Sequence, residues 1–380
     1  MSNTNSNQSL THTYVQIMST NTPTFGSYVY FDLNTSNYCI HEAVIQLNLS
    51  SIGGVSPNAA LMLPAFCSAF KFFTSISITN QNNVLDNIDS TYNYVLAQLY
   101  TSLEDSTFIN TAAGYYNNQL ARYNMSSTNS TYQIPIKSFF SQTRPELLNA
   151  NSSIRVSVLL DNLINIINQG SLIGLPVVSI NSASILLKVT KYSNELVQQK
   201  LMQLQRVPLM KSYNTMTYQP AVVQSGSTVA TISLSNFVGM QIQAIYFIIR
   251  SSTQITKNEG LLLTNNLLNY NVISSTGETV CGGVITPQQS LYVYNRVNTL
   301  GSFSCDGLFG NIFTVFHSSD IVSTLVNNGG IYGSRLYNGS EALVLNFTSA
   351  LASNFNVDIY ASCSSIYKQT SNGSIIKIVV

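Results

Sequence analysis

Short runs of β-branched and aromatic residues, alternating with polar ones, recur along the whole of this 380-residue chain. Runs of this kind, bounded by Asn, Ser, Gly and Pro, predict β-strands. In the first half they are Tyr28–Leu33, Ala43–Leu49, Phe70–Ile78, Thr131–Ile136, Ile154–Leu160 and Ser184–Thr190. In the second half they are Thr228–Leu234, Ile242–Ile249, Leu267–Ser274, Asn311–Phe316, Ala342–Phe347, Asn356–Ala361 and Ser374–Val380. The pattern predicts a mainly β protein of the sandwich or barrel class.

Helical spacing occurs midway through each half, which indicates an internal repeat. In the first half, one helical face collects five apolar residues: Ile88, Tyr92, Val95, Leu96 and Leu99. In the second half, residues 286–300 begin with Thr286, Pro287 and Gln289, which supply an N-cap, a first-turn proline and a capping-box partner. The strands that follow also correspond: Tyr132–Phe140, Ile154–Leu160 and Ile185–Tyr192 match Asn311–His317, Ala342–Phe347 and Phe355–Tyr360.

Two similar domains follow from this repeat, over 23–193 and 212–380, after an N-terminal arm over 1–22 whose composition favours disorder. We expect the arm to lie against a neighbouring subunit or along the inner side of an assembly. The connector over 194–211 is predicted to be helical, because Val197, Leu201 and Leu204 share a face and Pro208 ends the run.

The chain is poor in charge. Only 8% of its residues are charged, although 45% are hydrophobic and the mean hydropathy is +0.15. Ordinary soluble domains carry about 25% charged residues, and surfaces poor in charge tend to associate. We therefore expect much of the surface to be covered by other copies of the chain.

The net charge of +1 argues against a nucleic-acid-binding protein, which needs a basic face to contact phosphates. Lys and Arg are enriched only from Lys188 to Lys211. This enrichment fits a solvated linker or, as the alternative, a contact with a genome or a membrane. We expect no sequence-specific nucleic-acid binding.

Neither a membrane span nor a disulfide framework is predicted. A span needs about 20 consecutive apolar residues, and polar residues, Gly170 and Pro176 interrupt the best stretch, 156–189. Residues 1–8 carry no basic side chain and precede no apolar core, so we expect an intracellular, reducing compartment. The cysteines are odd in number and without CxxC spacing, which predicts buried thiols: Cys39, Cys67, Cys281, Cys305 and Cys363.

Catalytic chemistry has little support. His12 lies in the polar tail, and His41 precedes a strand. His317 and Asp320 lie beside serines, but sequence proximity alone does not establish the geometry of a hydrolase triad. The chain contains no P-loop, GxGxxG, HExxH or EF-hand motif. We therefore predict a protein that is not an enzyme and has no catalytic, cofactor or metal site.

Acidic and aromatic residues each allow a structural and a functional interpretation. The acidic pairs Asp86/Asp89 and Glu104/Asp105 fall at a helix start and a helix end, where solvated or capping roles are usual. Several tyrosines could stack on sugars or bases, but core packing or subunit contact is the expected role: Tyr115, Tyr116, Tyr213, Tyr218, Tyr292 and Tyr294.

The order of elements and several strand sequences resemble the double jelly-roll major capsid proteins, in particular those of virophages and polinton-like viruses. The resemblance covers roughly residues 25–380. It rests on Tyr132–Phe140 followed by Ile154–Val158, on Leu343–Phe347 and Val357–Ala361, and on Asn372-Gly373 before the last strand.

What the resemblance implies is a structural role. It implies two consecutive eight-stranded jelly rolls, each with a mid-domain helix, and homotrimers of pseudo-hexagonal outline that make lateral contacts in an icosahedral shell. Penton and minor capsid proteins, and an internal membrane in some cases, are the implied further partners. The chain would then reside in the virion after assembly inside the host cell.

Two other classes of protein stay open. A jelly-roll carbohydrate-binding protein, such as a viral fibre, an adhesin or a lectin-like module, would share the β-rich, Asn- and Tyr-rich composition, and it predicts a shallow aromatic pocket. A hydrolase built on a sandwich predicts His317 and Asp320 within reach of proton transfer.

Overall fold

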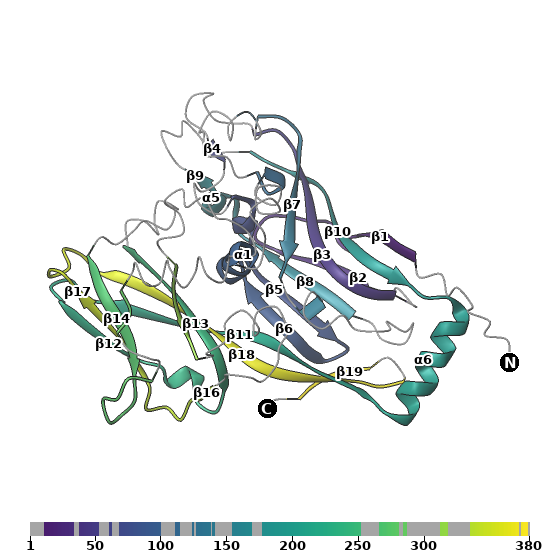
Figure 1. Ribbon diagram of the computed structural model, residues 1–380. Coiled ribbons are helices and arrows are strands. Elements are labelled where there is room, and N and C mark those ends of the chain that lie inside the picture. The colour runs from purple at the N-terminus through teal and green to yellow at the C-terminus, as the bar shows by residue number, and fades with distance from the viewer. Residues whose placement is uncertain are drawn as a thin grey trace.

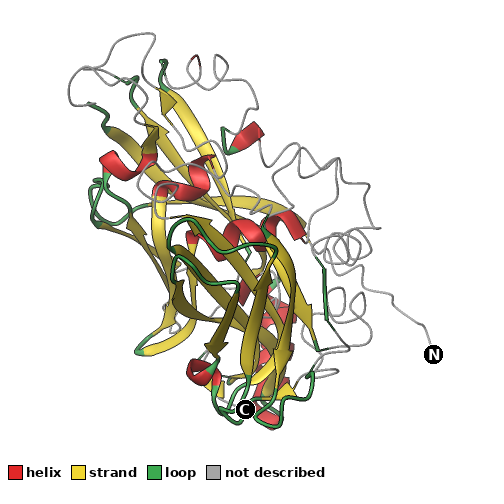
Figure 2. Cartoon of the chain, turned by 90° about the vertical axis from the view of Figure 1, so that its left-hand side faces the viewer, coloured by secondary structure: helices red, strands yellow, loops and turns green. Residues whose placement is uncertain are grey.

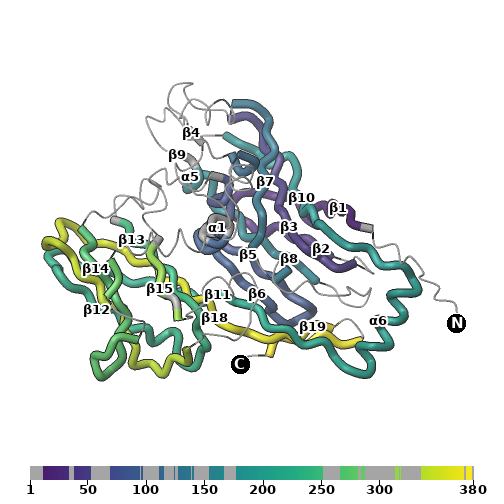
Figure 3. The backbone as a smooth tube through the Cα atoms, viewed as in Figure 1, coloured from purple at the N-terminus to yellow at the C-terminus, as the bar shows by residue number. Residues whose placement is uncertain are grey.

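The computed structural model describes residues 11–33, 38–52, 61–62, 68–99, 111–114, 124, 127–137, 139–140, 154–168, 177–251, 266–280, 284–286, 312–317, 335–371 and 374–378. Two β-sandwiches follow one another along the chain, the first in the purple-to-blue half and the second in the green-to-yellow half (Figures 1 and 3). Strands dominate and helices are short (Figure 2), which confirms the predicted mainly β class.

The first sandwich consists of two four-stranded antiparallel sheets. One has the order β1 (Thr11–Met18), β10 (Ile180–Lys191), β3 (Tyr38–Leu49), β7 (Ser130–Ile136). The other has the order β2 (Tyr28–Leu33), β8 (Ile154–Leu160), β5 (Phe73–Asn80), β6 (Asn83–Asp89). Apolar side chains of alternate residues meet between the sheets, as in β8, where Val156 and Val158 are buried and Arg155 is exposed.

Short elements complete the first sandwich. They are η1 (Ser68–Phe72), α1 (Ser90–Leu99), α5 (Leu163–Ile166) and the pair of β4 (Leu61–Met62) with β9 (Ile167–Asn168). Helix α1 lies within the stretch predicted to be helical, but strand β6 was not predicted, and the helix begins later than the helical spacing suggested, because Ile88 is part of β6 and Asp89 precedes the helix. The Asp89 Oδ1 accepts a hydrogen bond of 2.6 Å from the Tyr92 backbone N–H, so Asp89 acts as the N-cap.

The second sandwich repeats the strand order of the first. Its larger sheet has the order β11 (Leu209–Val223), β18 (Phe355–Gln369), β13 (Gln241–Ser251), β15 (Ile312–Phe316), and its smaller sheet β12 (Val229–Ser233), β17 (Ala342–Phe347), β14 (Leu267–Ile273). Thr279 and Ile285 form bridges to β14, where β6 pairs with β5 in the first sandwich. The additional elements are η2 (Ser235–Phe237), β16 (Arg335–Leu336) beside β13, and β19 (Ile375–Ile378) beside β18.

Helix α6 (Asn194–Arg206) joins the end of β10 to the start of β11, as the helical spacing of the connector predicted (Figure 1). The Ser193 hydroxyl accepts a hydrogen bond from the Leu196 backbone N–H at its start, and the helix ends before Val207. Val197 and Leu204 are its buried side chains.

The predicted N-terminal arm over 1–22 is wrong for residues 11–18, which form β1. This strand pairs with β10 of the same chain, from Thr11 opposite Lys191 to Met18 opposite Ser184, and Val15 and Ile17 pack against the core. Strand β11 was also unexpected. Residues 1–10 and the predicted helix over 287–300 lie outside the described residues, and the division at 194–211 remains a prediction.

Candidate assembly surfaces

The two sandwiches contact each other through a packed interface, which we call the seam. It is formed by β6 and α1 of the first sandwich against the outer face of the β11-β18-β13-β15 sheet, beneath α1 in Figure 1. The Tyr92 ring of α1 lies 5.8 Å from the Tyr360 ring and 6.2 Å from the Tyr246 ring. Because of this cover, residues 357–365 of β18 are buried on both faces of the sheet.

A second aromatic group extends the seam. The Phe139 ring lies 5.2 Å from both the Tyr213 and the Tyr367 rings, edge to face. The Tyr213 hydroxyl donates a hydrogen bond of 2.6 Å to the Leu85 carbonyl oxygen, and the Ile375 backbone N–H donates one of 3.0 Å to Asn80 Oδ1. Edge-to-face pairs of this kind add about 0.5–1.5 kcal/mol each to the burial of the rings.

These contacts test the interpretation of the tyrosines. Tyr213 packs in the seam, as expected, and does not offer a stacking platform. Tyr218 is 39% exposed, and its hydroxyl donates a hydrogen bond of 2.7 Å to Asp358 Oδ1. Tyr115, Tyr116, Tyr292 and Tyr294 lie outside the described residues.

Two carboxylates of β6 lie in the seam. Asp86 is buried and not solvated, whereas Asp89 is partly buried and caps α1, which is one of the two roles expected for this pair. The Asp86 Oδ2 accepts a hydrogen bond of 2.9 Å from the Phe139 backbone N–H. Burial raises the pKa of Asp86 to about 6, although the Phe139 N–H and the charge of Lys377 act in the opposite direction. Burial likewise raises the pKa of Asp89 to about 6, although the Tyr92 N–H and the charge of Lys71 lower it.

The other acidic residue of the seam, Asp358, forms an ion pair with Arg250. Glu104 and Asp105 lie outside the described residues.

The matching sheet of the first sandwich presents an outer face that the described part of the chain leaves accessible, and we call it the open face. It belongs to β1-β10-β3-β7, whose register places Gln16, Leu186, Val44 and Pro135 in one row across the sheet. Leu186, Val44 and Pro135 are half-buried, and beside this row Tyr14 and Met18 are 64% and 54% exposed.

Neutral polar side chains surround the apolar row. Gln16 Nε2 donates to Ser184 Oγ at 2.9 Å, Ser184 Oγ donates to Gln46 Oε1 at 3.1 Å, and Asn48 Nδ2 donates to Thr131 Oγ1 at 2.8 Å. The charged groups in these rows are Lys188 and Glu42, whose side chains form an ion pair at 3.6 Å. An apolar centre with a hydrogen-bonded polar rim is the composition of a protein–protein interface.

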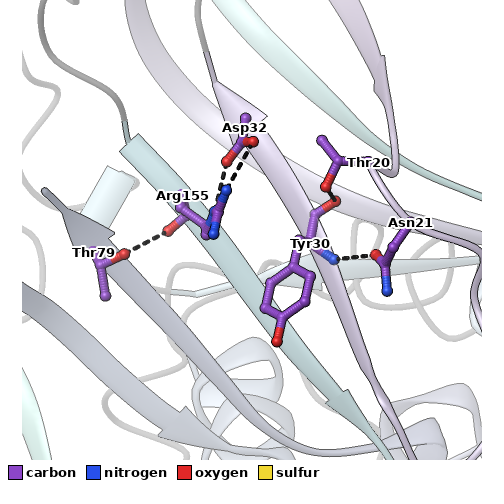
Figure 4. A network of polar contacts seen from close by, with 6 residues as sticks. All are labelled: Thr20, Asn21, Tyr30, Asp32, Thr79 and Arg155. Atoms are coloured by element: carbon purple, nitrogen blue, oxygen red, sulfur yellow. Dashed lines mark hydrogen bonds and ion pairs between the residues drawn. The ribbon is translucent and has the colours of Figure 1, made fainter.

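The outer face of the other sheet of the first sandwich has a different character. Arg155 forms a two-bond ion pair with Asp32, at 2.7 Å from Nε and 3.0 Å from Nη2, and its guanidinium lies 5.3 Å from the Tyr30 ring centroid (Figure 4). The Arg155 hydrogen bond holds the pKa of Asp32 below its ordinary value. Thr20 and Asn21 hydrogen-bond the backbone of Tyr30 and close the edge of β2.

His317 is held by a tyrosine. Its Nε2 lies 2.8 Å from the Tyr337 hydroxyl, and its backbone N–H donates to the Gln243 carbonyl oxygen at 2.9 Å. Burial lowers the pKa of His317 to about 4, so the ring is neutral at physiological pH. Asp320, its partner in the hydrolase hypothesis, lies outside the described residues.

The other two histidines share a threonine. Thr190 Oγ1 lies 2.7 Å from His41 Nε2 and 2.9 Å from His12 Nδ1, which connects β1, β10 and β3 at one end.

Cys39 and Cys363 are buried, as predicted for the cysteines, whereas the other three lie outside the described residues. Within the described ranges, no three His, Cys, Asp or Glu side chains form a group that could hold a metal ion. The helices of those ranges include none of sufficient length and apolarity to span a membrane.

Comparisons with known proteins agree with the strand order. No protein-family model matches the chain, and no curated protein matches its sequence. Among solved structures, VP54 of PBCV-1, as fitted into a reconstruction of the virophage Sputnik, has a TM-score of 0.68 and 11% identity over 98% of this chain and 97% of VP54. The Faustovirus major capsid protein has a TM-score of 0.63 and 10% identity over 96% and 92% of the two chains. The chain has the double jelly-roll fold of these capsid proteins.

The mavirus major capsid protein has the same fold, with a TM-score of 0.56 and 10% identity over 97% of this chain and 90% of its own. The expected resemblance to double jelly-roll capsid proteins is thereby confirmed at the level of the fold. Both jelly rolls contribute, because the matches span nearly the whole chain. The open face consequently corresponds to the face of the second jelly roll that lies in the seam: they are the outer faces of the two matching sheets, β1-β10-β3-β7 and β11-β18-β13-β15.

Proposed function

We propose that this chain is a viral major capsid protein whose copies form homotrimers of pseudo-hexagonal outline, and that the trimers tile an icosahedral shell. The observation that carries the proposal is the difference between two corresponding faces. The outer face of β11-β18-β13-β15 is covered by the first jelly roll, whereas the residues that the structure describes leave the outer face of β1-β10-β3-β7 accessible, with the composition of an interface.

The contact inside one chain is head to tail. The side of the first jelly roll that carries β6 and α1 packs on the larger sheet of the second. If the second jelly roll packs in the same way on the open face of another copy, the matching sheets of both jelly rolls are covered, and the contact repeats from chain to chain. A head-to-tail contact of this kind closes into a ring when its rotation permits. Three chains, and hence six jelly rolls, is the number implied by the resemblance to the capsid family.

The chemistry of the open face suits such a contact. Neutral amides and hydroxyls can be buried at moderate cost when they are hydrogen-bonded, whereas buried charges need well-placed partners. Gln16, Ser184 and Gln46 already hydrogen-bond one another, and Val44 and Leu186 offer apolar surface for a partner to cover. Penton proteins, minor capsid proteins and an internal membrane are further partners in this proposal, and the virion is the location.

The experiment is a comparison of Val44→Glu with Ser157→Glu. Val44 lies at the centre of the open face, so a carboxylate there would be buried unpaired in the trimer and should shift the purified protein to monomers. Ser157 lies on β8, with its side chain on the outer face of the other sheet of the same jelly roll, and Ser157→Glu should leave the trimer intact. Light scattering measures the mass, and electron microscopy measures the outline of the particles.

The proposal fails if the wild-type chain stays monomeric at every concentration tested, or if Val44→Glu leaves the trimer unchanged. If both variants lose the trimer equally, the contact between chains is not formed by the open face. The carbohydrate-binding alternative gains no support from Tyr213 or Tyr218, because the first is buried in the seam and the second is hydrogen-bonded to Asp358.

A further inference from the structure

The seam contains an unusual concentration of ionisable groups for a chain with so few charges. Three aspartates reach it, Asp86 and Asp89 from β6 and Asp358 from β18. Asp86 and Asp358 are 2% and 6% exposed. All three lie where one jelly roll meets the other.

The groups around Asp86 offset only part of the free-energy cost of burying its ionised carboxylate. Its Oδ2 accepts a hydrogen bond from Phe139, and the rings of Tyr92 and Tyr213, from α1 and β11, lie near enough to interact with its charge. Lys377 of β19, on the other side of the seam, interacts favourably with this charge, and burial lowers the pKa of that amine. No ion pair forms between Asp86 and any cation of the described residues.

Asp89 is held from both sides of the seam. Its Oδ1 accepts a hydrogen bond from Tyr92, and it also hydrogen-bonds the Tyr360 hydroxyl of β18. Lys71 of η1 interacts favourably with its charge, and Asp358 unfavourably. Lys71 Nζ donates a hydrogen bond of 3.4 Å to Thr91, and Arg250 of β13 is already paired with Asp358.

We propose that the seam is a proton-dependent clasp, in which protonation of Asp86 and Asp89 holds the two jelly rolls together and ionisation of both lets the seam open more readily. The geometry supports this role because β6, which carries both carboxyls, packs against β11 and β19 across the seam, and Asp89 also hydrogen-bonds Tyr360 of β18. Opening returns them to water, where the ionised form is no longer penalised.

The direction of the pH dependence follows from the pKa of each carboxyl. Both have a pKa of about 6 in the closed seam, against an ordinary value of 3.8. The closed seam therefore binds more protons than the open one between these values, and opening becomes more favourable as the pH rises through 6. Between pH 5 and pH 7.5, each carboxyl should increase the opening equilibrium by about tenfold, and the two together by about a hundredfold.

The test is hydrogen–deuterium exchange of the full-length protein in its purified state at pH 5 and pH 7.5, corrected for the intrinsic rate of exchange. Peptides that cover β6, β18 and β19 should lose about a hundredfold in protection at the higher pH, and peptides of β12 and β17, remote from the seam, should not. Asp86→Asn and Asp89→Asn should each remove about tenfold of this change. Asn retains the oxygen that accepts from Phe139 or from Tyr92, and Asn is a good N-cap.

Asp32→Asn is the matched control, because Asp32 lies on an outer face and its ion pair with Arg155 lowers its pKa (Figure 4). This variant should keep the wild-type change at the seam. Equal protection of the seam at the two pH values would overturn the proposal, and so would an unchanged pH response in the double variant Asp86→Asn/Asp89→Asn. Neither outcome depends on whether the chain forms trimers.

Discussion

At the scale of single residues, burial determines how His317 responds to pH. Its folded-state pKa of about 4 lies below the ordinary value of 6.5, so the unfolded chain takes up this proton first as the solution is acidified. The contribution of a neutral His317 to stability is therefore complete above pH 6.5 and is lost as the pH falls toward 4. This direction is opposite to that of Asp86 and Asp89.

We expect His317→Gln to reduce the loss of stability of the second jelly roll in acid by up to about 3 kcal/mol, the equivalent of the shift in pKa. The amide of Gln can still hydrogen-bond the Tyr337 hydroxyl. Denaturant unfolding at pH 4.5 and pH 7 measures the effect, with the exposed His12→Gln as the control. An identical loss of stability in wild type and His317→Gln would contradict the assignment.

At the scale of elements, α6 depends on its cap. The Ser193 hydroxyl accepts a hydrogen bond from Leu196, Glu195 lies in the first turn and Arg206 in the last, and both charges suit the helix dipole. Ser193→Ala should cost about 1 kcal/mol, and Ser193→Asp, which retains the acceptor, should cost almost nothing. Hydrogen exchange of the first turn of α6 distinguishes the two. Equal exchange in both variants would show that the cap has no effect.

The elements also show what alternation along the chain can predict. Strands β2, β8 and β17 lie at their predicted bounds, because each is a short run of mainly β-branched, aromatic and aliphatic residues in which buried and more exposed positions alternate. Strand β11 was missed because Thr, Tyr, Asn and Ser fill both of its faces and Pro220 falls within it. Strand β1 was missed because its apolar face is short and consists of Val15 and Ile17. With Tyr14, Gln16 and Met18 facing outward, the segment as a whole resembles a polar tail.

At the scale of the whole molecule, one apolar cluster unites the first jelly roll with the covered face of the second. The Phe139 ring, between Tyr213 and Tyr367, lies at the centre of this union. We expect the wild-type chain to unfold in one calorimetric transition and Phe139→Ala to separate it into two, because the variant loses about 3–5 kcal/mol at the seam.

Phe313→Ala is the control for that prediction. Phe313 is 2% exposed and stacks on Phe247 inside the second jelly roll, away from the seam. Removal of the Phe313 ring should lower the free energy of unfolding by a similar amount, but the first jelly roll should not unfold in a separate transition. A single transition in Phe139→Ala would indicate that the remaining contacts of the seam suffice for cooperative unfolding.

The candidate surfaces were less accessible to prediction than the fold. The low charge of the chain predicted contacts between copies, but the row of Val44, Leu186 and Pro135 emerges only when the register joins three strands that are distant in sequence. Asp86 and Asp89 were expected to be solvated or to cap a helix, and their place in the seam was not predicted, because no local pattern reveals that β6 packs against β11 and β19. Contacts between domains carry no periodicity along the chain, and only the folded structure locates them.

Helix α6 has a consequence for the two kinds of contact. As a covalent tether, it keeps the two jelly rolls at an effective concentration on the order of millimolar, whatever the concentration of the protein. Opening of the seam is therefore a unimolecular event that dilution does not promote and that releases no subunit. Contacts across the open face belong to separate chains and weaken on dilution. Titratable groups placed in the tethered contact can thus respond to pH without dissociating the assembly.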